Sequence, residues 1–182
     1  MLLKIKTIRH SYRKVPVNIR GFFKKALILL FGWLILYHML LVPLDIPDRW
    51  LTRVNTDIAA KLLSLKYPAD LLIKDNSCFI SMNNKSILWV SNGCNALELY
   101  VLYLGFLLCV PTTAKRFFLF AAAGIATIFS LNVLRIAALA LIAWKSPKYM
   151  DFAHHYAFTL IVYSFIFVGW ILYSKRYEAK LG

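Results

Sequence analysis

Long apolar segments, several of them flanked by lysine and arginine, constrain this chain more than any other feature of its sequence. Four such segments are present, at roughly 24–44, 95–110, 117–144 and 156–173. A helix needs about 20 apolar residues to cross the hydrocarbon core of a bilayer. The third segment exceeds that length, so we expect it to span up to about Arg135 and then to continue outward or to lie along the interface. The sequence therefore predicts an integral membrane protein with about four transmembrane helices.

The composition agrees with this class and disfavours a nucleic-acid-binding protein. Hydrophobic residues make up 60% of the 182 residues, and the net charge is +14. A soluble domain is usually nearer half apolar. The lysines and arginines flank the apolar segments, so we interpret the positive charge as a membrane anchor. No cleavable signal peptide is predicted, because the basic N-terminal stretch has no apolar run and the run that follows is long enough to span.

The distribution of basic residues predicts the orientation of the chain. Eight lysines and arginines lie in the first 25 residues, two in the 111–116 loop and three after residue 174. In a four-span topology these regions share one side of the membrane, and the positive-inside rule places that side in the cytoplasm. We therefore expect a multi-pass protein of the cytoplasmic (inner) membrane with both termini cytoplasmic.

This topology divides the chain into parts, in order: a basic cytoplasmic tail (1–23), a first transmembrane helix (24–44), an outer loop (45–93), a transmembrane core (94–175) and a second cytoplasmic tail (176–182). Within the outer loop, apolar spacing over 50–65 predicts a helix lying on the membrane surface. Residues 78–90, CFISMNNKSILWV, predict two short strands about an Asn-Asn-Lys turn. The predicted fold class is an all-α integral membrane protein with an outer interfacial helix and a short β-hairpin.

Three kinds of reactive side chain reach the same depth at the outer side. Cys94 begins the second span, in the stretch SNGCNALEL, and His154 and His155 immediately precede the fourth. Arg135 lies about 20 residues beyond the cytoplasmic 111–116 loop, which at 1.5 Å per residue places it roughly 30 Å away, at the outer boundary. An arginine embedded in an apolar run is costly unless it is paired or lines a wet cavity, so it marks a candidate functional site.

A thiol, a guanidinium and an imidazole at one depth suit nucleophilic catalysis. The imidazole can accept the thiol proton, and a cation can stabilise the thiolate. The guanidinium can instead stabilise the oxyanion formed when the thiolate attacks a carbonyl group. The histidine can then protonate the departing amine. Such a site cleaves an acyl bond through a thioester and passes the acyl group to water or to an amine.

Three further polar residues are candidates for a supporting role. Glu98 stands four residues after Cys94 on the same helix face, where a structural ion pair with Arg135 is favoured over a direct catalytic role. Asn132, three residues before Arg135, can orient the site by hydrogen bonding. Asn95 can do the same beside the thiol.

Each candidate also has a structural alternative. Cys94 can pair with Cys78 in an oxidising compartment, which would remove the nucleophile. Arg135 can snorkel to the interface, and the two histidines can be ordinary interfacial residues. A metal site is not supported, because the sequence has no CxxC or HExxH spacing. No cofactor is indicated.

The ordered motifs NGCNALEL, NVLRI and HHYAF resemble those of the exosortase/archaeosortase family. The resemblance covers about 90–175, and the chain is most similar to the compact exosortases of Bacteroidetes-type bacteria. It implies a cysteine transpeptidase or protease, a hydrolase acting on the outer face of the cytoplasmic membrane. The implied substrates are exported proteins whose C-terminal sorting signal consists of a recognition motif, a transmembrane helix and a basic tail.

By this resemblance Cys94 is the nucleophile, Arg135 the cationic group and one of the two histidines the third member. Many members carry a small residue, usually glycine, four positions after the histidine. A threonine stands there for His155 and a phenylalanine for His154. His155 is therefore preferred and His154 is the second choice. The chain departs from longer members in lacking that glycine and in having fewer predicted spans.

Two other functions are compatible with the composition. One is a non-enzymatic membrane assembly factor for an export or polysaccharide system. In that case Cys94 would tolerate alanine or serine, and bulky changes at Gly105 or Gly124 would matter more. The other is a small channel or carrier, which is disfavoured because transport sites usually lie near the bilayer midplane. The lipid bilayer is the expected partner in every case, and nucleic acid in none.

Overall fold

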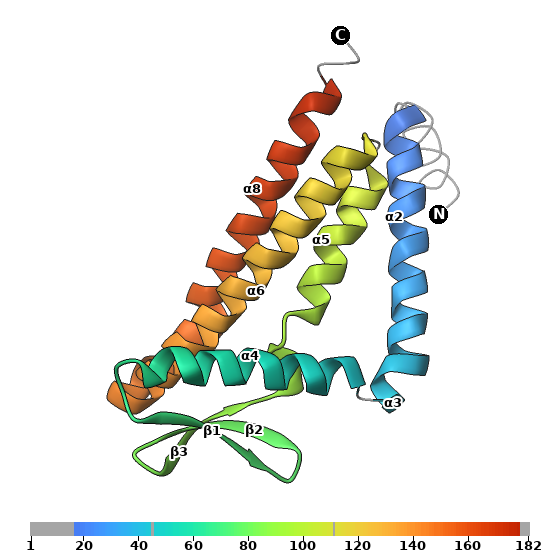
Figure 1. Ribbon diagram of the computed structural model, residues 1–182. Helices are drawn as coiled ribbons and strands as arrows, with labels where there is room; N and C mark the ends of the chain where they lie inside the picture. Colours follow the sequence, from blue (N-terminus) through green and yellow to red (C-terminus); the bar gives the residue numbers. More distant parts are fainter. Residues whose placement is uncertain (1–16, 45, 111, 179–182) are drawn as a thin grey trace, which may run out of the picture.

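The structure, a computed structural model, describes residues 17–44, 46–110 and 112–178. Figure 1 shows a bundle of helices with one more helix and a small sheet lying across one end, which we call the sheet end. The bundle consists of α2 (Val17–Leu36), α5 (Leu97–Cys109), α6 (Ala114–Lys145) and α8 (Phe158–Glu178). The start of α2 and the end of α8 lie at the opposite end, beside the α5–α6 connection. Most of the predicted tail 1–23 and the last residues of the predicted tail 176–182 lie outside the described residues.

Three helical segments are long and apolar enough to cross a membrane: Arg20–Leu44, Ala114–Lys145 and Pro147–Ser174. The protein is thus a multi-pass membrane protein, and these segments agree with the first, third and fourth predicted spans. The second predicted span, 95–110, corresponds to α5. With 13 residues, α5 rises only about 20 Å, less than the roughly 30 Å of a hydrocarbon core. A full set of four spans therefore stays a prediction.

At the sheet end, α2 and the stretch that leads into α8 each contain a π-helical turn. α2 continues through the π turn Tyr37–Leu41 into α3 (Val42–Leu44). On the other side, a 3-10 turn (Pro147–Tyr149), α7 (Met150–Phe152) and the π turn Ala153–Ala157 lead into α8. A π turn changes the direction in which the following side chains point, and such turns are frequent at functional sites.

α6 continues well past Arg135 without a break. Its 32 residues rise about 48 Å, which is more than a bilayer requires. Beyond Arg135, the side chains of Ile136, Leu139 and Ala140 are buried, because α4 and β3 pack against this part of the helix. The predicted continuation of the third segment is therefore helical, and it forms the platform on which the sheet end rests.

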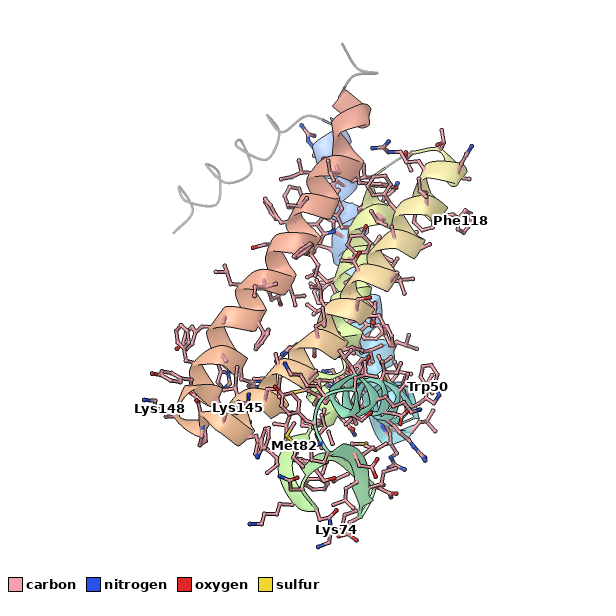
Figure 2. All side chains as sticks on the ribbon, turned by 60° about the vertical axis from the view of Figure 1, so that its left-hand side comes forward. Trp50, Lys74, Met82, Phe118, Lys145 and Lys148 are labelled. Atoms are coloured by element: carbon pink, nitrogen blue, oxygen red, sulfur yellow. The ribbon has the colours of Figure 1, made fainter. Side chains whose placement is uncertain are left out.

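α4 (Ile46–Ser64) crosses the bundle at the sheet end, which confirms a helix over most of the predicted range 50–65. One side of α4 is buried, with residues three or four positions apart: Thr52, Asn55, Thr56, Ala59, Ala60 and Leu63. This side packs on α6 and on the sheet. Trp50 is exposed, and Figure 2 shows it on the outer side of α4.

The sheet has three antiparallel strands in the order β1 (Ala69–Lys74), β2 (Ser77–Met82) and β3 (Lys85–Val90). β2 and β3 form the predicted hairpin, but the prediction of a single hairpin was wrong because it missed β1. Both connections are two-residue turns with positive φ at each residue: 48° and 62° at Asp75 and Asn76, and 50° and 61° at Asn83 and Asn84. Tight hairpin turns of this kind favour Asn and Asp, so the Asp-Asn pair was the available signal for the missed strand.

One face of the sheet is buried against α4 and α6. Cys78, Ile80 and Met82 of β2 and Leu88 and Val90 of β3 are at most 5% exposed. In Figure 2 Met82 lies between the sheet and the helices, whereas Lys74 lies at the far end of the sheet. Burial raises the pKa of the Cys78 thiol. All three cysteines are free thiols, so the alternative of a disulfide between Cys78 and Cys94 is wrong.

A second core holds the bundle together around Tyr103 of α5. The Tyr103 side chain is 4% exposed, and its hydroxyl donates to the carbonyl oxygen of Phe120 at 3.0 Å. Gly124 of α6 and Gly169 of α8 face the ring. A Cβ at Gly124 would lie 1.9 Å from Tyr103 Cε1, and one at Gly169 would lie 3.2 Å from Cε2. The two glycines therefore leave space for the Tyr103 ring between α6 and α8, an arrangement that we call the wedge.

Gly124→Ala tests this wedge. The added methyl group must displace the Tyr103 ring, and overpacking of this kind costs about 1–3 kcal/mol. Gly105→Ala is the matched control, because no atom of the described residues lies within 4 Å of a Cβ at Gly105. We expect the thermal unfolding midpoint in detergent to fall for Gly124→Ala and to hold or rise for Gly105→Ala. Equal midpoints would contradict the wedge.

Candidate active site

The sheet and the bundle meet at the loop between β3 and α5, residues 91–96. The Ser91 hydroxyl oxygen accepts from the Gly93 backbone N–H at 3.1 Å, and the Ser91 carbonyl accepts from the Cys94 N–H at 2.9 Å. These bonds close a 3-10 turn over Asn92–Cys94. Ala96 then adopts a left-handed backbone with a φ of 67°. For a residue with a Cβ this conformation costs about 1–3 kcal/mol, and it persists only where the surroundings hold it.

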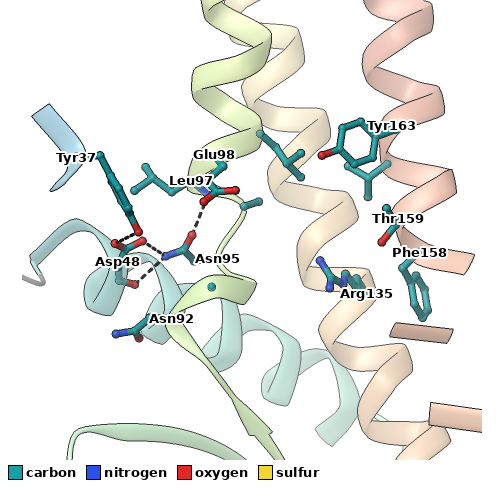
Figure 3. A pocket seen from close by; sticks show the side chains of 14 residues that line it. Tyr37, Asp48, Asn92, Asn95, Leu97, Glu98, Arg135, Phe158, Thr159 and Tyr163 are labelled. Atoms are coloured by element: carbon teal, nitrogen blue, oxygen red, sulfur yellow. Dashed lines mark hydrogen bonds between the residues drawn. The ribbon is translucent and has the colours of Figure 1, made fainter. Parts of the chain in front are cut away.

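Asn95 ties this loop to α4. Its side-chain amide donates to Asp48 Oδ1 at 2.5 Å and to the Asp48 carbonyl oxygen at 3.2 Å. Its Oδ1 accepts from the Leu97 N–H at 2.8 Å, and its carbonyl accepts from Asn55 Nδ2 at 3.2 Å. The Tyr37 hydroxyl donates to Asp48 Oδ2 at 3.2 Å (Figure 3). Asp48 and Asn95 are 7% and 2% exposed, so a buried network holds the loop from one side.

Asn132 of α6 holds the same loop from the other side. Its Nδ2 donates to the Cys94 carbonyl oxygen at 3.0 Å, and the residue is 2% exposed. The backbone carbonyls of two successive residues, Cys94 and Asn95, are thus bound by asparagine side chains from α6 and α4. The Cys94 residue itself remains partly exposed. The result is a fixed backbone that presents an accessible thiol.

Arg135 meets His154, one of the two candidate histidines. Its Nη2 lies 3.2 Å from His154 Nδ1. A guanidinium can only donate hydrogen bonds, so Nδ1 is the acceptor and the neutral ring carries its proton on Nε2. Arg135 Nε is buried and has no hydrogen-bond partner within the described part of the chain. The arginine therefore keeps a donor that is unused.

Cys94, Arg135 and His154 line one cavity of about 410 Å³, which we call the thiol cavity. Apart from Cys94, its lining comes from three segments: the last part of β3 with the residue after it, α6, and the stretch from Pro147 to His154 that leads into α8. The other lining residues are Leu88, Trp89, Val90, Ser91, Ile136, Leu139, Pro147, Met150 and Asp151. A mostly apolar cavity with a few convergent polar groups is typical of a binding or active site.

Arg135 also lines a second cavity of about 190 Å³ between α5 and α8 (Figure 3). Glu98, Thr159 and Tyr163 line it too. Glu98 is exposed, and no ion pair joins it to Arg135 in the residues that the structure describes. The interpretation of Glu98 as the partner of Arg135 was therefore wrong, because the guanidinium contacts His154 instead.

The His155 ring packs edge-on against the His154 ring, with the two centroids 4.8 Å apart, but His155 pairs with a different residue. Its Nε2 is 3.4 Å from Asp151 Oδ1, and its side chain is 62% exposed. Both histidines lie in the π turn Ala153–Ala157, where successive side chains leave the helix in different directions. The structure brings His154 to Arg135 and the thiol cavity and leaves His155 outside both cavities. A catalytic His155 stays a prediction that this geometry does not favour.

Residues 20–176 match the family model of transmembrane exosortases. The match includes every residue of the two cavities. The chain belongs to the transmembrane exosortase family. No curated protein and no solved structure matches it.

Several residues that hold the loop 91–96 of this exosortase, which we call the thiol loop, were not predicted from the sequence. Asp48, Asn55 and Tyr37 were not among the candidates, although two of them are polar and lie on the buried side of α4. The available signal was the row of polar residues at 48, 52, 55 and 56, spaced as one face of a helix. Polar residues on a face that also carries alanines and leucine indicate buried hydrogen bonds.

Asp48→Ala tests whether the network holds the thiol loop. The variant removes the Oδ1 acceptor of the buried Asn95 amide and leaves it only the longer bond to the Asp48 backbone carbonyl, so we expect a loss of about 1–3 kcal/mol. Asp57→Ala is the matched control on the same helix, because Asp57 pairs with Lys61 on the surface at 2.6 Å and such pairs contribute about 0–1 kcal/mol. The measurements are the thermal midpoint and the rate at which a maleimide labels Cys94, which we expect to rise in Asp48→Ala. Identical values for the two variants would refute this role of Asp48.

Proposed function

We propose that this exosortase is a membrane-embedded cysteine transpeptidase or protease that cleaves the C-terminal sorting signal of exported proteins through a thioester. One observation carries the proposal: Cys94, Arg135 and His154 come from three separate parts of the chain and line one cavity. They are the thiol, guanidinium and imidazole that the chemistry requires. His154 replaces His155 as the preferred third member, because His154 contacts Arg135.

The contact between Arg135 and His154 suggests how the substrate activates the thiol. While the guanidinium donates to Nδ1, the neutral imidazole has no free nitrogen that can accept a proton. A substrate carbonyl oxygen in the thiol cavity competes for the guanidinium. When Arg135 turns to that oxygen, Nδ1 is released and takes the proton of the Cys94 thiol. Substrate binding and thiolate formation are thereby coupled.

The remaining steps follow from these roles. The Cys94 sulfur attacks the carbonyl carbon, and Arg135 stabilises the oxyanion. The imidazolium gives its proton to the departing amine as the C–N bond breaks, which leaves a thioester. Water or an amine then attacks the thioester, its proton passes through His154 to the sulfur, and the free thiol returns.

We also propose that the sheet end faces outward from the cytoplasmic membrane. The opposite end of the bundle carries the start of α2, the α5–α6 connection and the end of α8 (Figure 1). Lys24, Lys25, Lys115 and Arg116 belong to these regions, and the positive-inside rule favours a cytoplasmic location for them. Both termini are then cytoplasmic, and the thiol cavity opens to the side where exported proteins emerge.

Cys94→Ala tests the nucleophile. The assay co-expresses an exported protein with a C-terminal signal that the wild-type enzyme cleaves, and follows precursor and product by immunoblot. We expect the Cys94→Ala variant, at equal membrane abundance, to accumulate precursor and to yield no product. Cys78→Ala and Cys109→Ala are the controls, because both residues are buried in the cores and neither lines the thiol cavity. Unchanged cleavage with Cys94→Ala would end the cysteine mechanism.

The adjacent histidines give a second test with a built-in control. General acid–base catalysis by a positioned side chain contributes about 10²- to 10⁴-fold to a rate. We therefore expect His154→Ala to lower the cleavage rate by at least about 100-fold, whereas His155→Ala keeps most of the activity. The measurement is the initial rate of cleavage in membranes that contain equal amounts of each variant. The opposite ranking would restore His155 as the third member.

A further inference from the structure

β3 is an edge strand whose outer side has no partner. It pairs with β2 and with no other strand. Outside the sheet itself, none of the backbone hydrogen bonds within 17–44, 46–110 and 112–178 involves Lys85–Val90. Half of its N–H and C=O groups therefore face away from the sheet, which makes the edge a template for another extended chain. Lysine stands only at its start, so the part nearest Cys94 lacks the charged residues that usually protect an edge.

The thiol cavity lies along this free edge. Leu88, Trp89 and Val90 form its β3 wall, and Cys94 and His154 lie in the same cavity. Neighbouring strands are about 4.8 Å apart, so a strand added to β3 runs through the cavity over α6. Every second side chain of that strand points to the side of the sheet that packs on α6, where Ile136 and Leu139 line the cavity and offer apolar contacts.

The edge also leads directly to the thiol. Only Ser91–Gly93 separate the end of β3 from Cys94. A peptide that pairs with β3 and continues in the same direction brings its next peptide bonds to Cys94 and Arg135. In a C-terminal sorting signal the transmembrane helix follows the cleaved bond, so the segment beside β3 precedes that bond. Its direction is then the direction of β3, which makes the added strand parallel to β3.

We infer that β3 binds the substrate by strand addition: an extended peptide segment, with apolar residues at alternate positions, pairs with the edge Lys85–Val90 and delivers the bond that follows it to Cys94. Strand addition takes affinity from main-chain hydrogen bonds and specificity from alternate side chains. The inference rests on the proposed function, and it assigns the place, the direction and the chemical class of the segment that is recognised.

Trp89 allows a direct test with a matched control. It is 62% exposed and lines the thiol cavity. The strand register places Trp89 opposite Phe79 and Phe79 opposite Leu72, so Leu72 lies in the same row on the other edge strand. Leu72 is 43% exposed. A photoreactive phenylalanine analogue is placed at position 89 or at position 72 of the full chain that also carries Cys94→Ala, and the co-expressed precursor is the probe.

We expect a crosslink between the exosortase and the precursor from position 89 and none from position 72. Equal crosslinking from both positions, or no crosslink from position 89 while precursor accumulates, would overturn the inference. A crosslink only to a second exosortase would also overturn it, because the edge would then pair two copies of this chain. Failure of the proposed function is distinct, since it shows as cleavage that does not depend on Cys94.

A proline scan of the substrate supplies an independent readout. Proline removes one backbone donor, and an added strand directs its N–H groups alternately toward and away from β3. We expect proline at every second position before the cleaved bond to lower cleavage by about 3- to 10-fold, the effect of one hydrogen bond. Intervening positions should tolerate proline better. A uniform response, with cleavage still dependent on Cys94, would contradict strand addition.

Discussion

The buried hydrogen bonds between Asn95 and Asp48 join the two halves of this molecule. Asp48 belongs to the helix that carries the sheet, and Asn95 follows the thiol in the loop that opens the bundle. Without this link the loop would have to satisfy two buried polar side chains in another way, at a cost of about 1–3 kcal/mol for each unpaired group. Asn95 also brackets Ala96, because its Oδ1 accepts from the Leu97 N–H, and the left-handed backbone of Ala96 turns the chain from the sheet into α5. The position of the thiol relative to the membrane therefore depends on a contact made 47 residues earlier in the chain.

The depth of each candidate side chain along the membrane normal could be predicted from the sequence, whereas the direction in which each side chain points from its helix could not. Counting residues from the basic loop placed Arg135 at the end of the bundle that carries Cys94, and the structure brings the two into one cavity. The same counting could not decide whether Arg135 faces Glu98 or a histidine, because both lie at that depth. The choice between adjacent histidines depends on the π turn Ala153–Ala157, and hydrophobic periodicity carries no signal for such a turn.

The sheet end shows the same division between local and tertiary information. The hairpin over 78–90 was predictable because β-branched and aromatic residues flank an Asn-Asn pair. The first strand was missed because its burial is weak, although the Asp75-Asn76 turn marks its end. Asp48 and Asn55 could not be assigned to the site, because their partner in the thiol loop is distant in sequence and is found only once α4 lies across the bundle.

Because the Tyr103 ring is held between Gly124 and Gly169, a small tilt of α8 at this contact moves the start of the helix by a larger distance. Gly169 rests against the ring, and His154 lies 15 residues away along the same run of helical turns, which is about 22 Å at the usual rise. A tilt of about 3° at the wedge therefore displaces the imidazole by roughly 1 Å, and a misplacement of this size can lower a rate by about 100-fold. The spacing of α6 and α8 at Tyr103 is thus linked to the alignment of His154 with Arg135. In the proposed reaction, forces that the bilayer exerts on the tilt of α8 would then act on the rate.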